Sequence, residues 1–165
     1  MTLAEVMVAV GVSSIVLAVV AAFSFFNARS FAAIGNYVDL DETSRKAVDV
    51  MTKEIRQTKA LSDYQTNALT FIDYDDKPLQ YIYDPVAQKL SRVKNGMTSV
   101  LLKECDSLEF QIYQRTPQPG TNSFYAATNA ALCKLVDMKW RCSRSILGKR
   151  SNTETVQTAQ VVIRN

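Results

Sequence analysis

A long uncharged run at residues 6–26 constrains this chain more than any other feature of its sequence. The run contains no proline. At about 1.5 Å per residue, a helix of this length just crosses a hydrocarbon core of roughly 30 Å. The residues that follow read as ordinary amphipathic protein. We therefore expect a membrane-spanning helix at the N-terminus, followed by a single globular part.

The composition argues against several classes of function. The 165 residues include no histidine, which removes the commonest general base, the commonest metal ligand and every serine–histidine or cysteine–histidine catalytic arrangement. The net charge of +3 is small and its basic residues are spread along the chain, so we expect no nucleic-acid partner. The sequence has no glycine-rich phosphate loop and no Cys-x-x-Cys pair. We expect no catalytic site, no metal and no cofactor.

Glu5 is the only charged residue among the first 28, and it stands at the head of the apolar run. A secretory signal carries basic residues before its apolar segment, and none precedes residue 6. A carboxylate at the edge of hydrocarbon is costly unless a partner compensates it. The nearest positive charge in the sequence is the α-amino group of Met1. In a stack of staggered helices, Glu5 would instead meet the amine of a neighbouring subunit.

The segment Met1-Thr2-Leu3-Ala4-Glu5-Val6, followed by the apolar run, resembles the mature N-terminus of type IV pilins and type II secretion pseudopilins. The resemblance implies that a prepilin peptidase removes a basic leader before Met1, that the Met1 amine is N-methylated, and that Glu5 makes an intersubunit salt bridge. It also implies a homo-oligomeric helical filament, built by pilus assembly machinery from subunits held in the inner membrane. Ser14 and Ala22 stand where many members have a helix-breaking glycine and proline.

Two shorter phrases resemble a subgroup of the same family. Residues 45–57 resemble the end of the long helix in minor pilins and J-type minor pseudopilins, and residues 161–165 resemble the final strand of that group. These phrases favour a minor, tip-located subunit.

Small residues recur at a spacing of four within the apolar run. Ala9 and Ser13 form one series, and Ser14, Ala18 and Ala22 form another. Small residues at helical spacing allow neighbouring helices to approach closely. The same residues could equally occur by chance in an apolar segment, so both interpretations stay open.

The helix is expected to continue to about residue 58, because residues 27–58 contain no proline and carry apolar residues near helical spacing. Gly35-Asn36 is its weakest point, where we expect a kink or a short break. The opposite face carries three acid-to-base pairs at the spacing that favours helical ion pairs, namely Asp41–Arg45, Glu42–Lys46 and Asp49–Lys53.

Beyond residue 61 the pattern becomes that of β-strands, with Asn95-Gly96 as the strongest hairpin signal. The fold class is therefore α+β: a long N-terminal α-helix, half membrane-spanning and half amphipathic, packed on an antiparallel β-sheet meander as in pilins. We divide the chain into residues 1–26, 27–60 and 61–165, the last being a globular β-rich head. Residues 116–131 are expected to form a variable surface loop. The expected strands are residues 68–73, 78–83, 88–94, 97–103, 108–114, 135–141 and 158–164.

The three cysteines, Cys105, Cys133 and Cys142, suggest one disulfide and one spare thiol in a protein that leaves the cytoplasm. Cys133 and Cys142 bracket an expected strand, which would hold them about 30 Å apart. Pairing residue 114 with residue 133 in an antiparallel hairpin places Cys105 opposite Cys142, so we predict a Cys105–Cys142 bridge. Three reduced cysteines, or a bridge between Cys133 and Cys142 across an irregular loop, are the alternatives.

Taken together, these features predict a structural subunit of an extracellular type IV pilus-like or pseudopilus filament, polymerising through its apolar helix. The precursor would lie in the inner membrane, and the assembled filament in the periplasm or outside the cell. The alternatives are a minor, tip-located pseudopilin of a secretion system and a membrane-tethered β-domain that binds a ligand. Glu5 separates the filament from the tether, because a tether gains nothing from it.

Overall fold

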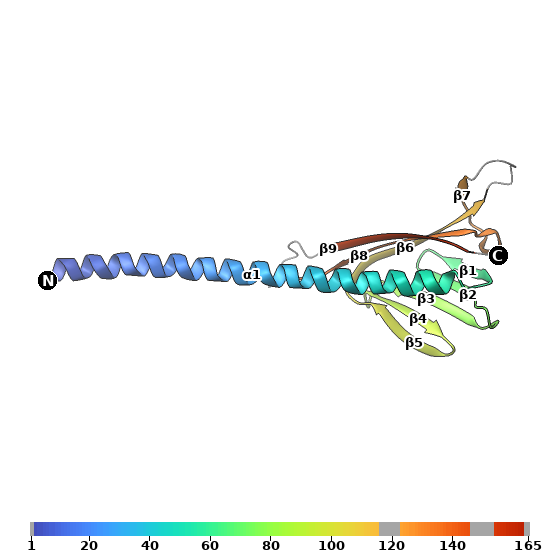
Figure 1. The fold of residues 1–165 in the computed structure, drawn as a ribbon, viewed down its shortest axis with the longest axis horizontal. Coiled ribbons are helices and arrows are strands. Elements are labelled where there is room, and N and C mark those ends of the chain that lie inside the picture. The colour runs from blue at the N-terminus through green and yellow to red at the C-terminus, as the bar shows by residue number, and fades with distance from the viewer. Residues whose placement is uncertain (1, 116–122, 146–153, 164–165) are drawn as a thin grey trace.

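A single long helix dominates the computed structural model, which describes residues 2–115, 123–145 and 154–163. Helix α1 spans Leu3–Ile55, with Thr2 as its N-cap and Arg56 at its C-terminal end. Its first half projects from the rest of the molecule as a rod, and its second half lies along the β-strands of the head (Figure 1). The expected α+β class is confirmed.

The second half of α1 presents one buried stripe to the head. Its buried residues follow the spacing of one helical face: Leu40, Ser44, Ala47, Met51 and Ile55. Two of the three predicted ion pairs form on the outer surface, Arg45 to Asp41 at 2.7 Å and Lys46 to Glu42 at 2.5 Å. Apolar burial therefore holds one side of this half against the head, and charged side chains on the other side face the solvent.

The predicted break at Gly35-Asn36 is wrong, because α1 runs through both residues without interruption. A glycine inside a helix costs only about 1 kcal/mol relative to alanine. The backbone hydrogen bonds of the turns on either side offset this cost, so the helix continues through Gly35.

The first sheet is an antiparallel meander of five strands in the order β1-β2-β3-β4-β5. Its β4–β5 turn uses Asn95 and Gly96, both with positive φ (53° and 75°), as the Asn-Gly signal predicts. Sequence reasoning missed β1, but it placed the other four strands to within one residue at each end. The strands are β1 Ala60–Gln65, β2 Ala68–Ile72, β3 Pro78–Asp84, β4 Lys89–Lys94 and β5 Met97–Leu102.

The remaining strands form a second antiparallel sheet in the order β7-β6-β8-β9, so the head is not the one meander that the sequence predicted. The chain leaves β5 through Glu104, whose φ of 57° is left-handed, and β6 then pairs with β8 instead of returning to β5. Part of the expected 116–131 loop is ordered as β7 and a 3-10 turn at Ala130–Leu132, whereas residues 116–122 lie outside the described part. The strands are β6 Cys105–Arg115, β7 Phe124–Ala126, β8 Leu135–Ser143 and β9 Glu154–Val162.

The core lies where the two sheets and α1 meet. Both sheets contribute fully buried large side chains, including Phe71 and Tyr81 from the first and Phe110 and Trp140 from the second. Backbone hydrogen bonds also join the sheets, since the Phe110 N–H donates to the Thr66 carbonyl at 2.9 Å. The head is therefore packed against the second half of the helix, where the buried residues run from Leu40 to Ile55.

Candidate assembly surface

The helix begins with a capping box between Thr2 and Glu5. The Glu5 carboxylate accepts a hydrogen bond from the Thr2 backbone N–H at 2.8 Å, and the Thr2 hydroxyl accepts one from the Glu5 N–H at 3.4 Å. These bonds satisfy backbone groups that the first turn of any helix leaves free. Glu5 therefore caps its own helix. We did not predict this role, although the Thr-x-x-Glu spacing is typical of a capping box. Met1, the predicted partner of Glu5, lies outside the described residues.

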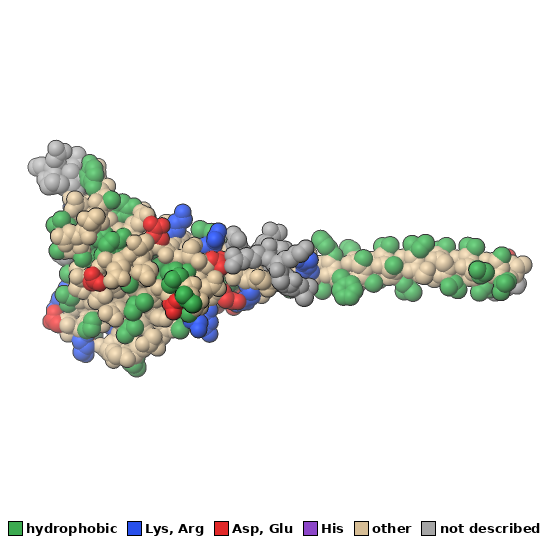
Figure 2. All heavy atoms as spheres, turned by 180° about the vertical axis from the view of Figure 1, so that it is seen from behind, with side chains coloured by type: hydrophobic (Ala, Val, Ile, Leu, Met, Phe, Trp, Pro, Cys, Tyr) green, Lys and Arg blue, Asp and Glu red, His purple; other side chains and the backbone are tan. Residues whose placement is uncertain are grey.

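The projecting half of α1 carries large apolar side chains that the head does not bury. Figure 2 shows those on one face of the rod. Exposed large hydrophobic residues run from Leu3 to Val38. The segment is long and apolar enough to cross a membrane. An apolar surface of this extent in a single chain indicates that lipid or another protein covers it.

The predicted small residues divide between two opposite sides of the helix. At 100° per residue, Ala9 and Ser13 lie on one side, and Ser14, Ala18 and Ala22 on the other. All five are exposed. Gly11, which the sequence analysis did not include, shares the second side and has no neighbouring atom within 4 Å of the position that its side chain would occupy. The second side is thus the flatter one, and the five residues do not form one surface.

Two serine hydroxyls of the projecting half make hydrogen bonds inside the helix. Ser14 Oγ donates to the Gly11 carbonyl at 2.7 Å, and Ser24 Oγ donates to the Val20 carbonyl at 2.9 Å. Their polarity is therefore satisfied without any neighbour, and they can face an apolar surface at little cost.

At the base of the head, Arg144 connects the end of β8 to α1. Its guanidinium donates to Glu104 at 2.6 Å, to Asp39 at 3.0 Å and to the Asn36 side-chain oxygen at 3.2 Å. This group, here called the Arg144 clamp, makes Asn36 the first position along α1 at which the described residues of the head hold the helix by a side-chain hydrogen bond. The residues beyond it toward the N-terminus form the projecting rod.

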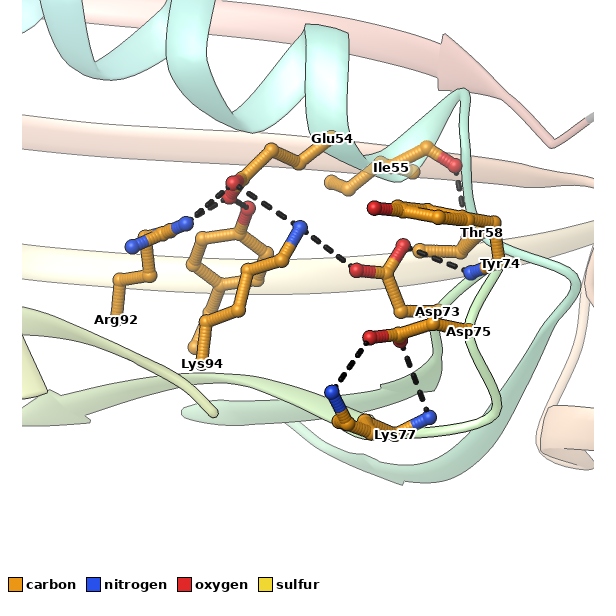
Figure 3. A network of polar contacts seen from close by, with 10 residues as sticks. Glu54, Ile55, Thr58, Asp73, Tyr74, Asp75, Lys77, Arg92 and Lys94 are labelled. Atoms are coloured by element: carbon orange, nitrogen blue, oxygen red, sulfur yellow. Dashed lines mark hydrogen bonds and ion pairs between the residues drawn. The ribbon is translucent and has the colours of Figure 1, made fainter. Parts of the chain in front are cut away.

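Near the other end of the head, Glu54 of α1 joins β3 and β4 (Figure 3). Its carboxylate accepts hydrogen bonds from Arg92 at 2.5 and 2.7 Å and from the Tyr81 hydroxyl at 2.7 Å. Lys94 lies 3.6 Å from the same carboxylate and 2.6 Å from Asp73. Burial raises the pKa of the Glu54 carboxyl, but the hydrogen bonds from Arg92 and Tyr81 outweigh it and hold that pKa below its usual range. Glu54 is therefore ionised and fixes the rotation of the helix on the sheet.

The three aspartates of the β2–β3 turn are each paired with a lysine. Asp73 pairs with Lys94, Asp75 with Lys77 at 3.1 Å and Asp76 with Lys59 at 2.5 Å. Among the described residues, no cluster of three or more cysteine, aspartate or glutamate side chains is placed to hold a metal ion.

Cys105 and Cys142 lie directly opposite each other on β6 and β8, and both are free thiols in this structure. The predicted hairpin register is one residue out along most of its length, since Tyr113 pairs with Leu135. A bulge between Cys105 and Ser107 absorbs the difference and restores the predicted pairing at the cysteines. Cys133 is also buried, at the far end of β8.

Comparison with known proteins adds no relative: no protein-family model matches the chain, and no curated protein matches it. The arrangement itself, a long apolar N-terminal helix packed on antiparallel sheets, is compatible with a pilin-like fold. The function must therefore be argued from the surface of this chain.

Proposed function

We propose that this chain is the structural subunit of a pilin-like filament, held in a membrane through α1 before assembly and packed through the same helix afterwards. The proposal rests on the length of the exposed apolar surface. Residues 3–26 measure about 36 Å as a helix, which already crosses a hydrocarbon core of roughly 30 Å. The apolar surface continues for another three turns, where a simple tether would need none.

This continuation is an apolar strip formed by Phe31, Ile34 and Val38. Their side chains are 74%, 61% and 56% exposed. At 100° per residue, all three lie on the side of α1 opposite the buried Ala47, so they point away from the head. A parallel helix from a second subunit, staggered along the first, would cover this strip.

A lysine placed in the strip tests the proposal. Ile34 lies about 12 Å beyond Phe26 along the helix, so Ile34→Lys should leave membrane insertion unchanged. It should sharply reduce filament yield, because it would bury an unpaired charge between subunits. The control is Ala32→Lys, which places the same charge on an exposed residue more than 90° away around the helix. Filaments sheared from cells are counted by electron microscopy, and the membrane-bound chain by immunoblot.

Normal filament yield from Ile34→Lys cells would contradict the proposal. If the wild-type chain forms no filaments at all, the membrane-tethered binding module becomes the better interpretation.

The part played by Glu5 is tested separately, because its capping-box role must be distinguished from an intersubunit one. Glu5→Gln keeps the cap, since glutamine serves in a capping box, but removes the charge. Thr2→Ala weakens the cap and leaves the charge. We expect Glu5→Gln to lose filaments and Thr2→Ala to retain most of them. The opposite result would assign Glu5 to helix capping alone.

A further inference from the structure

The backbone around Cys105 and Cys142 has the geometry that a cross-strand disulfide requires. The Ser143 N–H donates to the Glu104 carbonyl at 3.1 Å, whereas the Cys105 N–H turns away and donates to the Gln88 carbonyl at 3.0 Å. Cys105 and Cys142 are therefore a non-hydrogen-bonded pair, the closer of the two kinds in an antiparallel ladder, with Cα atoms typically about 4.5 Å apart. This separation lies within the range of about 4.4–6.8 Å found in disulfides.

The two side chains also point into the same space. Cys105 is 0% exposed and Cys142 is 1% exposed, and both belong to the core. The Cys105 thiol donates a hydrogen bond to the Ser107 carbonyl at 3.3 Å. The nearby Cys142 thiol raises the pKa of Cys105, and Cys105 in turn lowers the pKa of Cys142. Ser44 of α1 lowers the pKa of Cys142, and the Tyr83 hydroxyl of the head donates to the Cys105 carbonyl at 2.9 Å, so the helix and the head together cover the pair.

Cys133 cannot compete for either partner. It is separated from Cys142 by the intact strand β8, at about 3.3 Å per residue, and a disulfide needs Cα atoms within about 7 Å. Burial raises the pKa of its thiol to about 11, which makes it a poor nucleophile at neutral pH.

We propose that Cys105 and Cys142 are joined by a disulfide in the mature protein, and that this bond forms before the head and α1 pack around the pair. The first part rests on the proposed function, because the head must lie in an oxidising compartment outside the cytoplasm. The second part follows from burial: once the head and α1 have packed around the pair, no oxidant reaches either sulfur.

The oxidant is a disulfide, either that of a dithiol-disulfide exchange protein or that of a small thiol. One cysteine thiolate attacks a sulfur of the oxidant, forms a mixed disulfide and releases the first oxidant thiol. The other cysteine then attacks the mixed disulfide, forms the Cys105–Cys142 bond and releases the second thiol. Two electrons and two protons pass from the cysteines to the oxidant.

The bond would reinforce the base of the head where it holds the helix. Glu104 and Arg144, which form the Arg144 clamp with Asn36 and Asp39, flank the two cysteines in the sequence. A covalent bond between β6 and β8 at this point keeps the two halves of the clamp together. Its loss in Cys105→Ala or Cys142→Ala should lower the melting temperature of the full chain by about 10 °C.

Peptide mapping of the wild-type chain tests the bond directly. Trypsin separates the three cysteines into residues 104–115, 116–134 and 142–144, because each lies between different lysine and arginine residues. The full chain is denatured in N-ethylmaleimide, digested without reduction and analysed by mass spectrometry. We expect residues 104–115 linked to residues 142–144, and a maleimide adduct on the peptide that carries Cys133. Adducts on Cys105 and Cys142, or any link to Cys133, would overturn the proposal.

The order of events is tested on the same protein. Chain that is reduced in denaturant and then refolded should stay reduced in glutathione disulfide, and should oxidise only when denaturant is restored. Equal oxidation rates in the folded and denatured chain would refute the stated order.

Protease accessibility of the head in right-side-out membrane vesicles separates the two proposals. Reduced cysteines on an external head would overturn the disulfide alone. Reduced cysteines on a head that faces the cytoplasm would overturn the proposed function as well.

Discussion

The contact between Glu54 and the β3–β4 hairpin can be removed by one substitution of nearly the same shape. Glu54→Gln keeps the side-chain volume but removes the charge that Arg92 and Lys94 face. It also replaces one carboxylate oxygen with an amide that donates hydrogen bonds, so the Arg92 guanidinium, which now donates to both oxygens, keeps only one acceptor. We expect the head to lose stability without losing its fold.

The expected loss follows from how far each partner is buried. Removing one member of a fully buried ion pair costs about 3–5 kcal/mol, and one hydrogen bond to a charged group contributes about 1.5–3 kcal/mol. The Arg92 and Lys94 side chains are 23% and 18% exposed, so water compensates part of what they lose. We therefore expect a loss of about 2–3 kcal/mol, which at about 4 °C per kcal/mol lowers the melting temperature by about 8–12 °C.

The assay uses Trp140, the single tryptophan of the chain. Its indole N–H donates to Ser44 Oγ of α1 at 3.4 Å, so its fluorescence reports whether helix and sheet are in contact. The full chain is melted in detergent. The control is Glu42→Gln, the same substitution in an exposed ion pair of the same helix, for which we expect a shift below about 2 °C. Equal shifts for the two variants would refute the reasoning.

Three further predictions concern the same helix and one turn. Because the folded pKa of Glu54 lies below the usual value of a glutamate, its contribution to stability is present above that usual value and is lost as the pH falls through the folded pKa. Melting curves from pH 6 to pH 3 should therefore show the gap in melting temperature between wild type and Glu54→Gln shrinking toward acid, and a constant gap would contradict this. Ile55→Ala should cost about 2–4 kcal/mol by leaving a cavity, against less than about 1 kcal/mol for the exposed Val50→Ala, as read from urea unfolding of both variants. Gly96→Ala should cost about 1 kcal/mol in the same assay because φ at that position is 75°, and an unchanged midpoint would show that the turn relaxes.

Much of the fold could be predicted because its signals are local. The periodicity of α1 and the Asn95-Gly96 turn each depend on neighbouring residues. Strand β1 was missed because Ala60–Gln65 is mostly polar, with only Leu61 buried, and it is held by pairing with β2. The division into two sheets was also missed, since it depends on which distant strand β6 joins.

The candidate surface divides in the same way. Spacing alone was enough to predict the capping box of Thr2 and Glu5. It was also enough to predict that the small residues lie on two sides of the helix. We made neither prediction. The Arg144 clamp was not readable, because it joins residues more than a hundred positions apart. The position of Cys105 opposite Cys142 was predicted correctly only because a bulge cancelled an error of one residue in the register, and the predicted bridge between them stays a prediction.

The unbroken helix acts as a lever. Between Asn36 in the Arg144 clamp and Leu3, α1 extends about 50 Å, so a tilt of about 5° at the clamp moves Leu3 sideways by about 4 Å. In the proposed filament, a displacement of that size would move Glu5 away from the amine of a neighbouring subunit. The position of the N-terminus in the proposed filament would therefore depend on how firmly the Arg144 clamp holds the other end of the rod. If the proposed filament forms, a substitution in the clamp would change assembly from a distance of about 50 Å.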